Sequence, residues 1–418
     1  MNNEKNDNNY IWIISQEADH YKTGPHNRHF EFASELLKHG YSPIVFAASA
    51  TRQSGIQIIK NDDLYLVDES SGFPFVFIKT PQYKNMKERL IAIFLFHMRL
   101  NRTIKQFPIP KAVLGSSAYP LSPYLGIKAA HRVGAKSICE IRDLWPLSLE
   151  EYSIIPKGGL IAKFMYRFEK YLYEHSDEVI FTLPGGKQYI RNRKLDVAHG
   201  GKVDLKKVHY INNGVNLEHF QKNQKEYRYQ NKEFSDFDGK RIVYTGSLRR
   251  ANKVDVLLDV AKRFNRNDVR FYLFGRGERE HFLKERCASE NIANVYFMGW
   301  VSKKYIPSIL SQADIAIEFG EDNYNLMRYG TSPNKLFDYF ASGIPVFSNH
   351  KNPFSIINQE HCGIEQHFDS SEECFELLCE ILNDQKKLEL WKSNSLSTAK
   401  KYSFEVLTAE LIKIIERS

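Results

Sequence analysis

The sequence lacks the features that mark several classes of protein. Its five cysteines form no Cys-x-x-Cys pair and no spacing typical of a metal site, and five cannot all pair in disulfides. This usage indicates a reducing compartment and no bound metal. The polar start MNNEKNDNNY has no apolar segment behind it, so we expect no signal peptide. The longest strongly apolar run, residues 90–98, falls short of the about 20 residues that cross a bilayer.

The glycine pattern of dinucleotide-binding proteins is also missing. The first apolar run, YIWII, is followed by SQEADHYKTGPHNRHF, which contains no Gly-x-Gly-x-x-Gly. In the second half, FGRGER has two glycines but no third at the required spacing. We therefore expect no nicotinamide and no other cofactor.

Acidic residues are scarce between residues 79 and 136, where Glu88 is the only one among eleven lysines and arginines. Inside this region, segment 84–105 combines an apolar centre with basic flanks, which is typical of a helix lying on an anionic membrane surface. A half-buried helix with solvated lysines and arginines explains the segment equally well. No recognised nucleic-acid motif accompanies the charge, so nucleic acid is not an expected partner.

Short β-rich segments alternate with helical patterns along the chain of 418 residues, which is long enough for two domains. The polar segment 216–240 predicts a linker, and the alternation restarts after it. We predict an α/β fold with two doubly wound, Rossmann-like domains facing across a cleft. The expected domains are residues 1–205 and 206–400, and a C-terminal helix in 401–418 that packs back toward the first domain. Ligands of such sheets lie beyond the carboxyl ends of the strands.

The segment GTSPNKLFDYFASGIPV, residues 330–346, predicts a short helix with clear ends. Ser332 suits the N-cap, Pro333 the first helical position, and Gly343 the position after the last turn. Lys335 and Asp338 can share a neighbouring face. The amino end of such a helix suits a phosphate. A well-capped surface helix with a weak ion pair is the alternative.

An ordered series of segments in both halves resembles glycosyltransferase family 4, whose members are retaining enzymes with the GT-B fold. The segments are EIRDLWPLSLEEY, FEKYLYEHSDEVIFTLPG, INNGVNLEHF, YTGSL, LFGRGE, VYFMGWV, ADIAIEFG and SPNKLFDYFASGIPV. The Arg-Asp-Leu-Trp-Pro and Ser-Pro-Asn-Lys-Leu-Phe-Asp-Tyr pieces are similar to a subgroup that includes the O-antigen and capsule N-acetyl-L-fucosamine transferases.

The resemblance implies a donor site in the second domain. Lys335 and the loop cations Arg249, Arg250 and Lys253 would supply catalytic positive charge to the departing diphosphate, and Asp338 would bind the ribose. The nucleotide-sugar site would comprise Gly246, Ser247, Gly275, Trp300, Val301, Gly330, Thr331, Ser332, Pro333, Asn334, Leu336 and Asp338. On the acceptor side, the resemblance and the sequence point to Gly24, His26, Arg142 and Asp143.

Two departures from the family pattern affect these roles. Gly330 stands where an acidic residue is usual, and Gly246-Ser247-Leu248 replaces Gly-Arg-Leu. A lone loop histidine such as His26 is also often simply solvated, and Arg142 and Asp143 could form a structural pair at a strand end.

The function implied is a retaining, metal-independent transferase that moves a sugar, such as an N-acetylated amino or deoxyamino sugar, from a UDP-sugar to a polyprenyl-diphosphate-linked saccharide. Such an enzyme would build bacterial O-antigen or capsule in the cytoplasm, peripherally on the inner face of the membrane through segment 84–105. A nucleotide-sugar epimerase of the same fold and a catalytically silent nucleotide-sugar-binding subunit are the alternatives.

Overall fold

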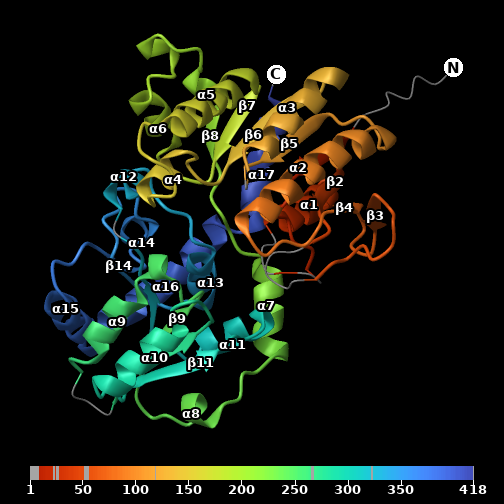
Figure 1. Ribbon diagram of the computed structural model, residues 1–418. Coiled ribbons are helices and arrows are strands. Elements are labelled where there is room, and N and C mark those ends of the chain that lie inside the picture. The colour runs from red at the N-terminus through yellow and green to blue at the C-terminus, as the bar shows by residue number, and fades with distance from the viewer. Residues whose placement is uncertain are drawn as a thin grey trace. The chain divides into compact units, whose positions relative to one another are not determined.

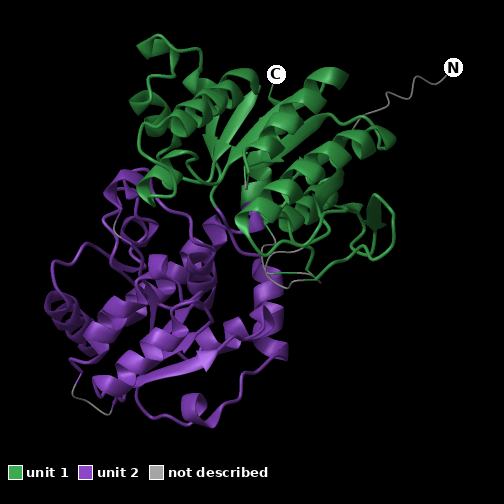
Figure 2. Cartoon of the chain, viewed as in Figure 1, with its two compact units in different colours: residues 1–212, 407–418 green, residues 213–406 purple. Residues whose placement is uncertain are grey.

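The computed structural model describes residues 9–21, 24, 28–50, 56–117, 119–264, 268–321 and 323–417. The chain forms two compact units, Met1–Asn212 with Leu407–Ser418 and Asn213–Val406 (Figure 2). We expected the first domain to end at residue 205. Strand β8 (Val208–Tyr210) pairs with β7 in the first sheet, and for this reason the chain changes unit only after Asn212.

Unit 1 is built on an eight-stranded sheet with the order β3-β4-β2-β1-β5-β6-β7-β8 (Figure 1). Besides β8, its strands are β1 (Tyr10–Ile14), β2 (Ser42–Ala48), β3 (Tyr65–Asp68), β4 (Phe75–Ile78), β5 (Ala112–Ser116), β6 (Lys136–Ile141) and β7 (Glu178–Phe181). All neighbours are parallel except β3 and β4. Strands alternate with helices as the sequence indicated, and the antiparallel edge strand β3 departs from that pattern.

The helices of unit 1 connect these strands. They are α1 (Arg28–Lys38), α2 (Met86–Thr103), α3 (Leu121–Val133), α4 (Leu147–Glu151), α5 (Leu160–His175), α6 (Gly186–Asn192) and most of α17 (Phe404–Glu416). Helix α3 contacts both α2 and α5, so these three lie in one layer on the sheet (Figure 1). The last turn of α17 is bonded to the sheet region, because the Lys111 ammonium lies 2.6 Å from both carboxylate oxygens of Glu416.

Helix α2 occupies most of the basic segment 84–105. It begins after Asn85, whose side chain accepts a hydrogen bond of 3.0 Å from the Glu88 amide, and this contact is an N-cap. Ala92, Phe96 and Leu100 face the core. Among the helices in the described residues, none is long and apolar enough to cross a membrane.

Unit 2 contains a six-stranded parallel sheet with the order β11-β10-β9-β12-β13-β14. Its strands are β9 (Lys240–Thr245), β10 (Val269–Phe274), β11 (Val295–Gly299), β12 (Ile315–Glu318), β13 (Val346–Ser348) and β14 (Gly363–Glu365). Ile242 and Tyr244 belong to one hydrophobic cluster and Val243 to another. Both faces of β9 are therefore buried, as expected for a doubly wound sheet.

The helices of unit 2 cover the two faces of this sheet (Figure 1). They are α7 (Leu217–Glu226), α8 (Lys232–Ser235), α9 (Val254–Ala261), α10 (Glu280–Ser289), α11 (Ile306–Leu310), α12 (Tyr324–Met327), α13 (Asn334–Ser342), α14 (Ile356–Gln359), α15 (Ser371–Asn383) and α16 (Gln385–Lys401).

The prediction of a linker at residues 216–240 is wrong. Helices α7 and α8 occupy much of this segment, and both belong to unit 2. Phe234 is fully buried and packs edge-on against Tyr272 and Phe274, with ring centres 4.8 and 5.5 Å apart. The segment is nearly free of aliphatic residues because aromatic residues supply its buried contacts.

This packing predicts the effect of shortening Phe234. The Phe234→Ala variant should lower the free energy of unfolding of unit 2 by about 3–5 kcal/mol, since it leaves a cavity among aromatic rings. Phe282→Ala, at a side chain that is 44% exposed, should cost about 1 kcal/mol or less. Urea unfolding followed by circular dichroism measures both, and equal effects would restore the linker interpretation.

Candidate functional site

The order in which strands are added to the second sheet reverses between β9 and β12. The strand order runs outward from β9 through β10 to β11 on one side, and from β12 through β13 to β14 on the other. In doubly wound sheets the crevice at such a switch point, outside the carboxyl ends of the strands, is where ligands bind. The loop that starts at Gly246 follows β9, and Glu318 is the last residue of β12.

Two predicted glycines bring main chains together beside this point. Gly246 and Gly275 follow β9 and β10 and have φ values of 154° and 156°. A Cβ atom on Gly275 would lie 1.7 Å from the carbonyl oxygen of Gly246. Position 275 therefore admits only glycine, since any side chain would push the two loops apart.

Hydrogen bonds within the loop after β9 hold its first turn. The Tyr244 hydroxyl donates to the Ser247 carbonyl oxygen at 2.9 Å, and the Asn252 side chain donates to the Ser247 hydroxyl at 3.0 Å. Lys253 has a φ of 43° and directly precedes α9. Of the predicted loop cations, Arg249 and Arg250 are exposed to solvent and Lys253 is half-buried.

Helix α13 begins differently from the prediction. It starts at Asn334, so Pro333 is the N-cap residue and not the first helical residue, and no side chain caps the helix. The Ser332 hydroxyl instead accepts a hydrogen bond of 3.2 Å from the Asn213 amide. The first turn therefore keeps amide groups without a side-chain cap, which suits an anion. The predicted end is confirmed, because Gly343 follows the last turn with a φ of 69°.

Lys335 pairs with a residue that the sequence analysis missed. Its ammonium lies 3.3 Å from Oε1 of Glu318, so the weak ion pair with Asp338, which belonged to the alternative interpretation of this helix, is not formed. The same ammonium lies 4.5 Å from the centre of the Tyr244 ring, and Lys335 is therefore close to the loop after β9. The sequence did contain a sign of this role, because Glu318 is a charged residue at the end of the otherwise apolar strand in ADIAIEFG.

Glu318 is also bound by a histidine. Its Oε2 lies 2.8 Å from Nε2 of His350, and both side chains are more than nine-tenths buried. Burial alone would raise the pKa of Glu318, but Lys335 and His350 hold it well below its usual range. Burial acts to lower the pKa of His350, but the Glu318 carboxylate raises it above its usual value. Burial raises the pKa of the neighbouring Glu365 to about 7.

Tyr339, on α13, ties the two strands of the switch point together. Its hydroxyl oxygen accepts from the Thr245 amide at 3.1 Å, at the end of β9, and the hydroxyl donates to the Ile317 carbonyl oxygen of β12 at 3.2 Å. The sequence predicted a role in donor binding for this helix, through its amino end and Asp338, and no link to the strands. The structure adds that the same helix fixes the spacing of β9 and β12.

The other predicted donor-site residues belong to unit 2. Asp338 is half-buried, and burial raises its pKa against the opposing effect of Lys303. Trp300, after β11, is 65% exposed, whereas Val301 is half-buried. The side chain of Leu336 is in the hydrophobic core. Gly330 is buried with a φ of 87°, Thr331 is half-buried and Asn334 is exposed.

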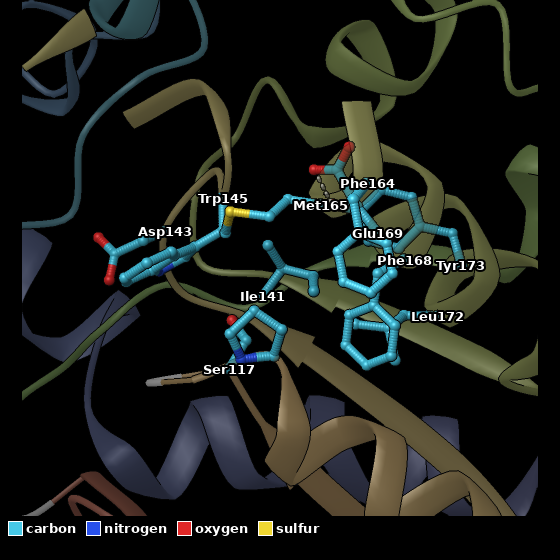
Figure 3. A pocket seen from close by; sticks show the side chains of 11 residues that line it. Ser117, Ile141, Asp143, Trp145, Phe164, Met165, Phe168, Glu169, Leu172 and Tyr173 are labelled. Carbon is cyan, nitrogen blue, oxygen red and sulfur yellow. Dashed lines mark hydrogen bonds between the residues drawn. The ribbon is translucent and has the colours of Figure 1, made fainter. Parts of the chain in front are cut away.

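The predicted acceptor-side residues lie in unit 1, except that His26 falls outside the described residues. Gly24 is half-buried, and a Cβ there would meet the Asp19 carboxylate. The Arg142 amide donates to the Ser117 hydroxyl at 3.0 Å. Asp143 lines an apolar pocket, with Asp143 and Trp145 on one side and Phe168 on the other (Figure 3).

The strongest contacts of the EIRD segment belong to Glu140. Its two carboxylate oxygens each lie 2.9 Å from a partner, Arg28 and His29 respectively. Arg28 also donates to the carbonyl oxygen of Ile211 at 2.9 Å. Arg28 and His29 hold the pKa of Glu140 well below its usual range although burial acts the other way. Glu140 therefore fixes the start of α1 to the sheet.

No group of three or more histidine, cysteine or carboxylate side chains suited to a metal ion occurs within the described ranges. All five cysteines are free thiols.

The contact between Gly246 and Gly275 predicts a position that tolerates no side chain. Gly275→Ala should lower the free energy of unfolding of unit 2 by about 2–4 kcal/mol, because the methyl group displaces main chain. Gly299→Ala is the matched control, since its φ is 71° but nothing lies within 4 Å of the new Cβ. Gly299→Ala should lower the free energy of unfolding by only about 1–2 kcal/mol, which is the cost of placing alanine in a left-handed backbone conformation. Thermal unfolding compares the two, and similar losses would show that the loops can separate.

The comparisons with known proteins agree with this architecture. Residues 239–384 match the family model described as "Glycosyl transferases group 1". A comparison with curated proteins gave no match.

Three solved structures illustrate the similarity. Sucrose-phosphate synthase from Thermosynechococcus elongatus gives a TM-score of 0.70 at 14% identity and covers 97% of this chain and 98% of its own. HepE from Anabaena, solved with UDP and glucose, gives a TM-score of 0.66 at 12% identity and covers 98% of this chain and 100% of its own. WaaG, a glycosyltransferase involved in lipopolysaccharide biosynthesis, gives a TM-score of 0.66 at 12% identity and covers 98% of this chain and 100% of its own. The chain therefore has the GT-B fold that the sequence predicted.

Proposed function

We propose that this chain is a retaining glycosyltransferase that uses a UDP-sugar. The observation that carries the proposal is the uncapped amino end of α13, with Lys335 beside the loop after β9 at the switch point of the second sheet. This arrangement offers amide donors and an ammonium to a diphosphate. The matched family segment contains β9, β12 and α13, and HepE, which has the same fold, was solved with UDP and glucose.

The proposed chemistry depends on fixed positive charge. As the bond between the sugar and the diphosphate breaks, negative charge builds on the departing phosphate oxygens. The α13 amino end and Lys335 would stabilise that charge, with Arg249, Arg250 and Lys253 adding to it, so the proposal requires no metal. Retention would follow if the acceptor attacks from the same face and gives its proton to the leaving phosphate.

The remaining donor contacts follow the family resemblance. Asp338 would bind the ribose by accepting hydrogen bonds from its hydroxyl groups. Trp300 and Val301 would flank the base. Gly246, Ser247 and Gly275 would let the main chain approach the phosphates. Gly330 and Thr331 would face the sugar, and the main chain at Ser332 to Asn334 would face the diphosphate.

The acceptor is proposed to be a lipid-linked saccharide of bacterial surface polysaccharide, as in the O-antigen and capsule subgroup that the sequence resembles. Helix α2 exposes Met86, Leu90, Ile91 and Phe94, each more than half exposed, on the helix that carries the basic segment. Helix α5, in the same layer, exposes Leu160 and Phe164 by 85% and 71%. Apolar side chains among lysines and arginines suit an anionic membrane surface. The enzyme would then act peripherally on the cytoplasmic face of the membrane.

A nucleotide-sugar-binding subunit without activity is the second candidate. Gly330, at the position where the family usually has an acidic residue, is buried and offers no side chain to a sugar.

Incubation with radiolabelled UDP-sugars, with and without a polyprenyl-diphosphate-linked saccharide, tests the proposal. Transfer to the lipid fraction that requires the saccharide supports it. Tight UDP-sugar binding without turnover would favour the silent subunit, and absence of UDP binding would contradict both.

Removing the Lys335 ammonium should impair the chemical step. In Lys335→Met we expect kcat to fall by the equivalent of about 2–4 kcal/mol, comparable with the loss of one preorganised donor. Lys386→Met, at an exposed residue in unit 2, should leave kcat unchanged. Single-turnover rates at saturating donor measure the effect. A variant at position 335 that works at full rate would remove Lys335 from the site.

Membrane binding should depend on the exposed face of α2. Leu90→Asp combined with Phe94→Asp should weaken binding to phosphatidylglycerol vesicles by about tenfold or more, since each side chain loses apolar burial. Ile109→Asp, at a side chain that is 59% exposed outside α2, is the matched control. Vesicle flotation at low and high salt provides the measurement. Binding that is insensitive to both salt and the α2 substitutions would contradict the membrane role.

A further inference from the structure

Glu318 is a buried carboxylate held between two basic side chains from different elements. Its side chain is 8% exposed, Lys335 of α13 binds one oxygen and His350, after β13, binds the other. The Ser348 hydroxyl lies 3.5 Å from the second oxygen. Each carboxylate oxygen thus has a defined partner, and the group has little freedom to rotate.

The arrangement fixes where the Lys335 ammonium lies. Lysine is a flexible point charge, and it stays in one place only if something holds it. Glu318 holds it at 3.3 Å, above the Tyr244 ring. The Tyr244 hydroxyl in turn donates to the Ser247 carbonyl oxygen in the loop after β9. The ammonium is therefore kept between α13 and that loop.

We propose that Glu318 and His350 are positioning residues that hold the Lys335 ammonium where the donor diphosphate departs. This inference rests on the proposed function and adds to it two residues that need not touch the substrate. A charge that is already in place costs no reorganisation when the transition state forms, and it is worth more there than a mobile one. A displacement of about 1 Å in such a group can cost about 100-fold in rate.

A double-mutant cycle tests the proposal, with Glu318→Gln, Lys335→Met and the double variant compared with the unchanged chain. Glutamine keeps the shape and an acceptor oxygen but removes the charge. Glu318→Gln alone should lower kcat about 10- to 100-fold with the donor KM nearly unchanged, because the defect lies in the transition state. In the Lys335→Met background, Glu318→Gln should lower kcat no further, since its effect passes through Lys335.

Melting temperatures separate positioning from folding. Lys335→Met leaves a buried carboxylate with one partner fewer, so the double variant should melt above the Lys335→Met variant. If Glu318→Gln lowers only the melting temperature and folded protein keeps its kcat, the role is structural and the proposal is overturned. Additive effects on kcat would overturn it as well.

The pH profile provides a second readout. His350 faces Glu318 of β12, Glu365 of β14 and Lys335 of α13, and Glu318 raises its pKa. Below that pKa His350 is charged, and above it Glu318 loses one cationic partner and the site one positive charge. In the unchanged chain kcat should therefore fall as the pH rises through this pKa, and in His350→Gln this limb should disappear. Glu365→Gln should retain it, and persistence of the limb in His350→Gln would overturn the role of His350.

Calorimetric titration with UDP distinguishes the two levels of failure. If the unchanged chain does not bind UDP, the proposed function fails and this inference fails with it. If UDP binds and transfer occurs while the cycle is additive, only the positioning role is lost.

Discussion

A buried carboxylate between a lysine and a histidine organises the switch point of the second sheet. Glu318 costs free energy to bury, and its charge is tolerated because Lys335 and His350 are bound to it. The consequence is geometric, since α13, β12 and the turn after β13 are held at one point. Tyr339 adds a second link, from α13 to the ends of β9 and β12. The amino end of α13 is therefore held in a fixed frame.

Unit 1 also contains a buried glutamate bound by two basic side chains. Glu140, at the carboxyl end of β6, binds Arg28 and His29 of α1 through separate oxygens. In both units a buried glutamate lies near the end of a parallel strand. Burial would raise its pKa, but one lysine or arginine and one histidine lower it and keep the carboxylate ionised. The two clusters differ in what their cations also contact. Arg28 is bonded to the main chain of Ile211, which makes its role structural, whereas Lys335 lies over a ring beside the loop after β9.

Much of this fold is predictable from the sequence because parallel strands are continuous apolar runs and several end in glycine. The failures have physical causes. Strand β3 lies at an antiparallel edge, where Leu66 is 44% exposed and gives no buried run. Residues 216–240 read as a linker because their buried contacts come from aromatic side chains. Ser332 matched the N-cap preference but bonds to Asn213 instead, a contact between segments far apart in the sequence.

Local patterns predicted where the candidate site residues lie in the fold but not what they contact. Gly246 and Gly275 follow β9 and β10, and Lys335 lies in the first turn of α13, since local patterns mark loop glycines and helix starts. The partner of Lys335 was missed because residues three apart on a helix were the nearest candidates, whereas the true partner belongs to a neighbouring strand. Pairings of this kind depend on strand order, which the sequence pattern does not specify.

A crystal structure of the protein with UDP bound examines the whole interpretation most directly. We predict that the β-phosphate lies within hydrogen-bond distance of the main-chain amides of Asn334 or Lys335 and of the Lys335 ammonium, with the α-phosphate near Gly246. Phosphorus atoms located away from the amino end of α13, with Lys335 still bound only to Glu318, would contradict it.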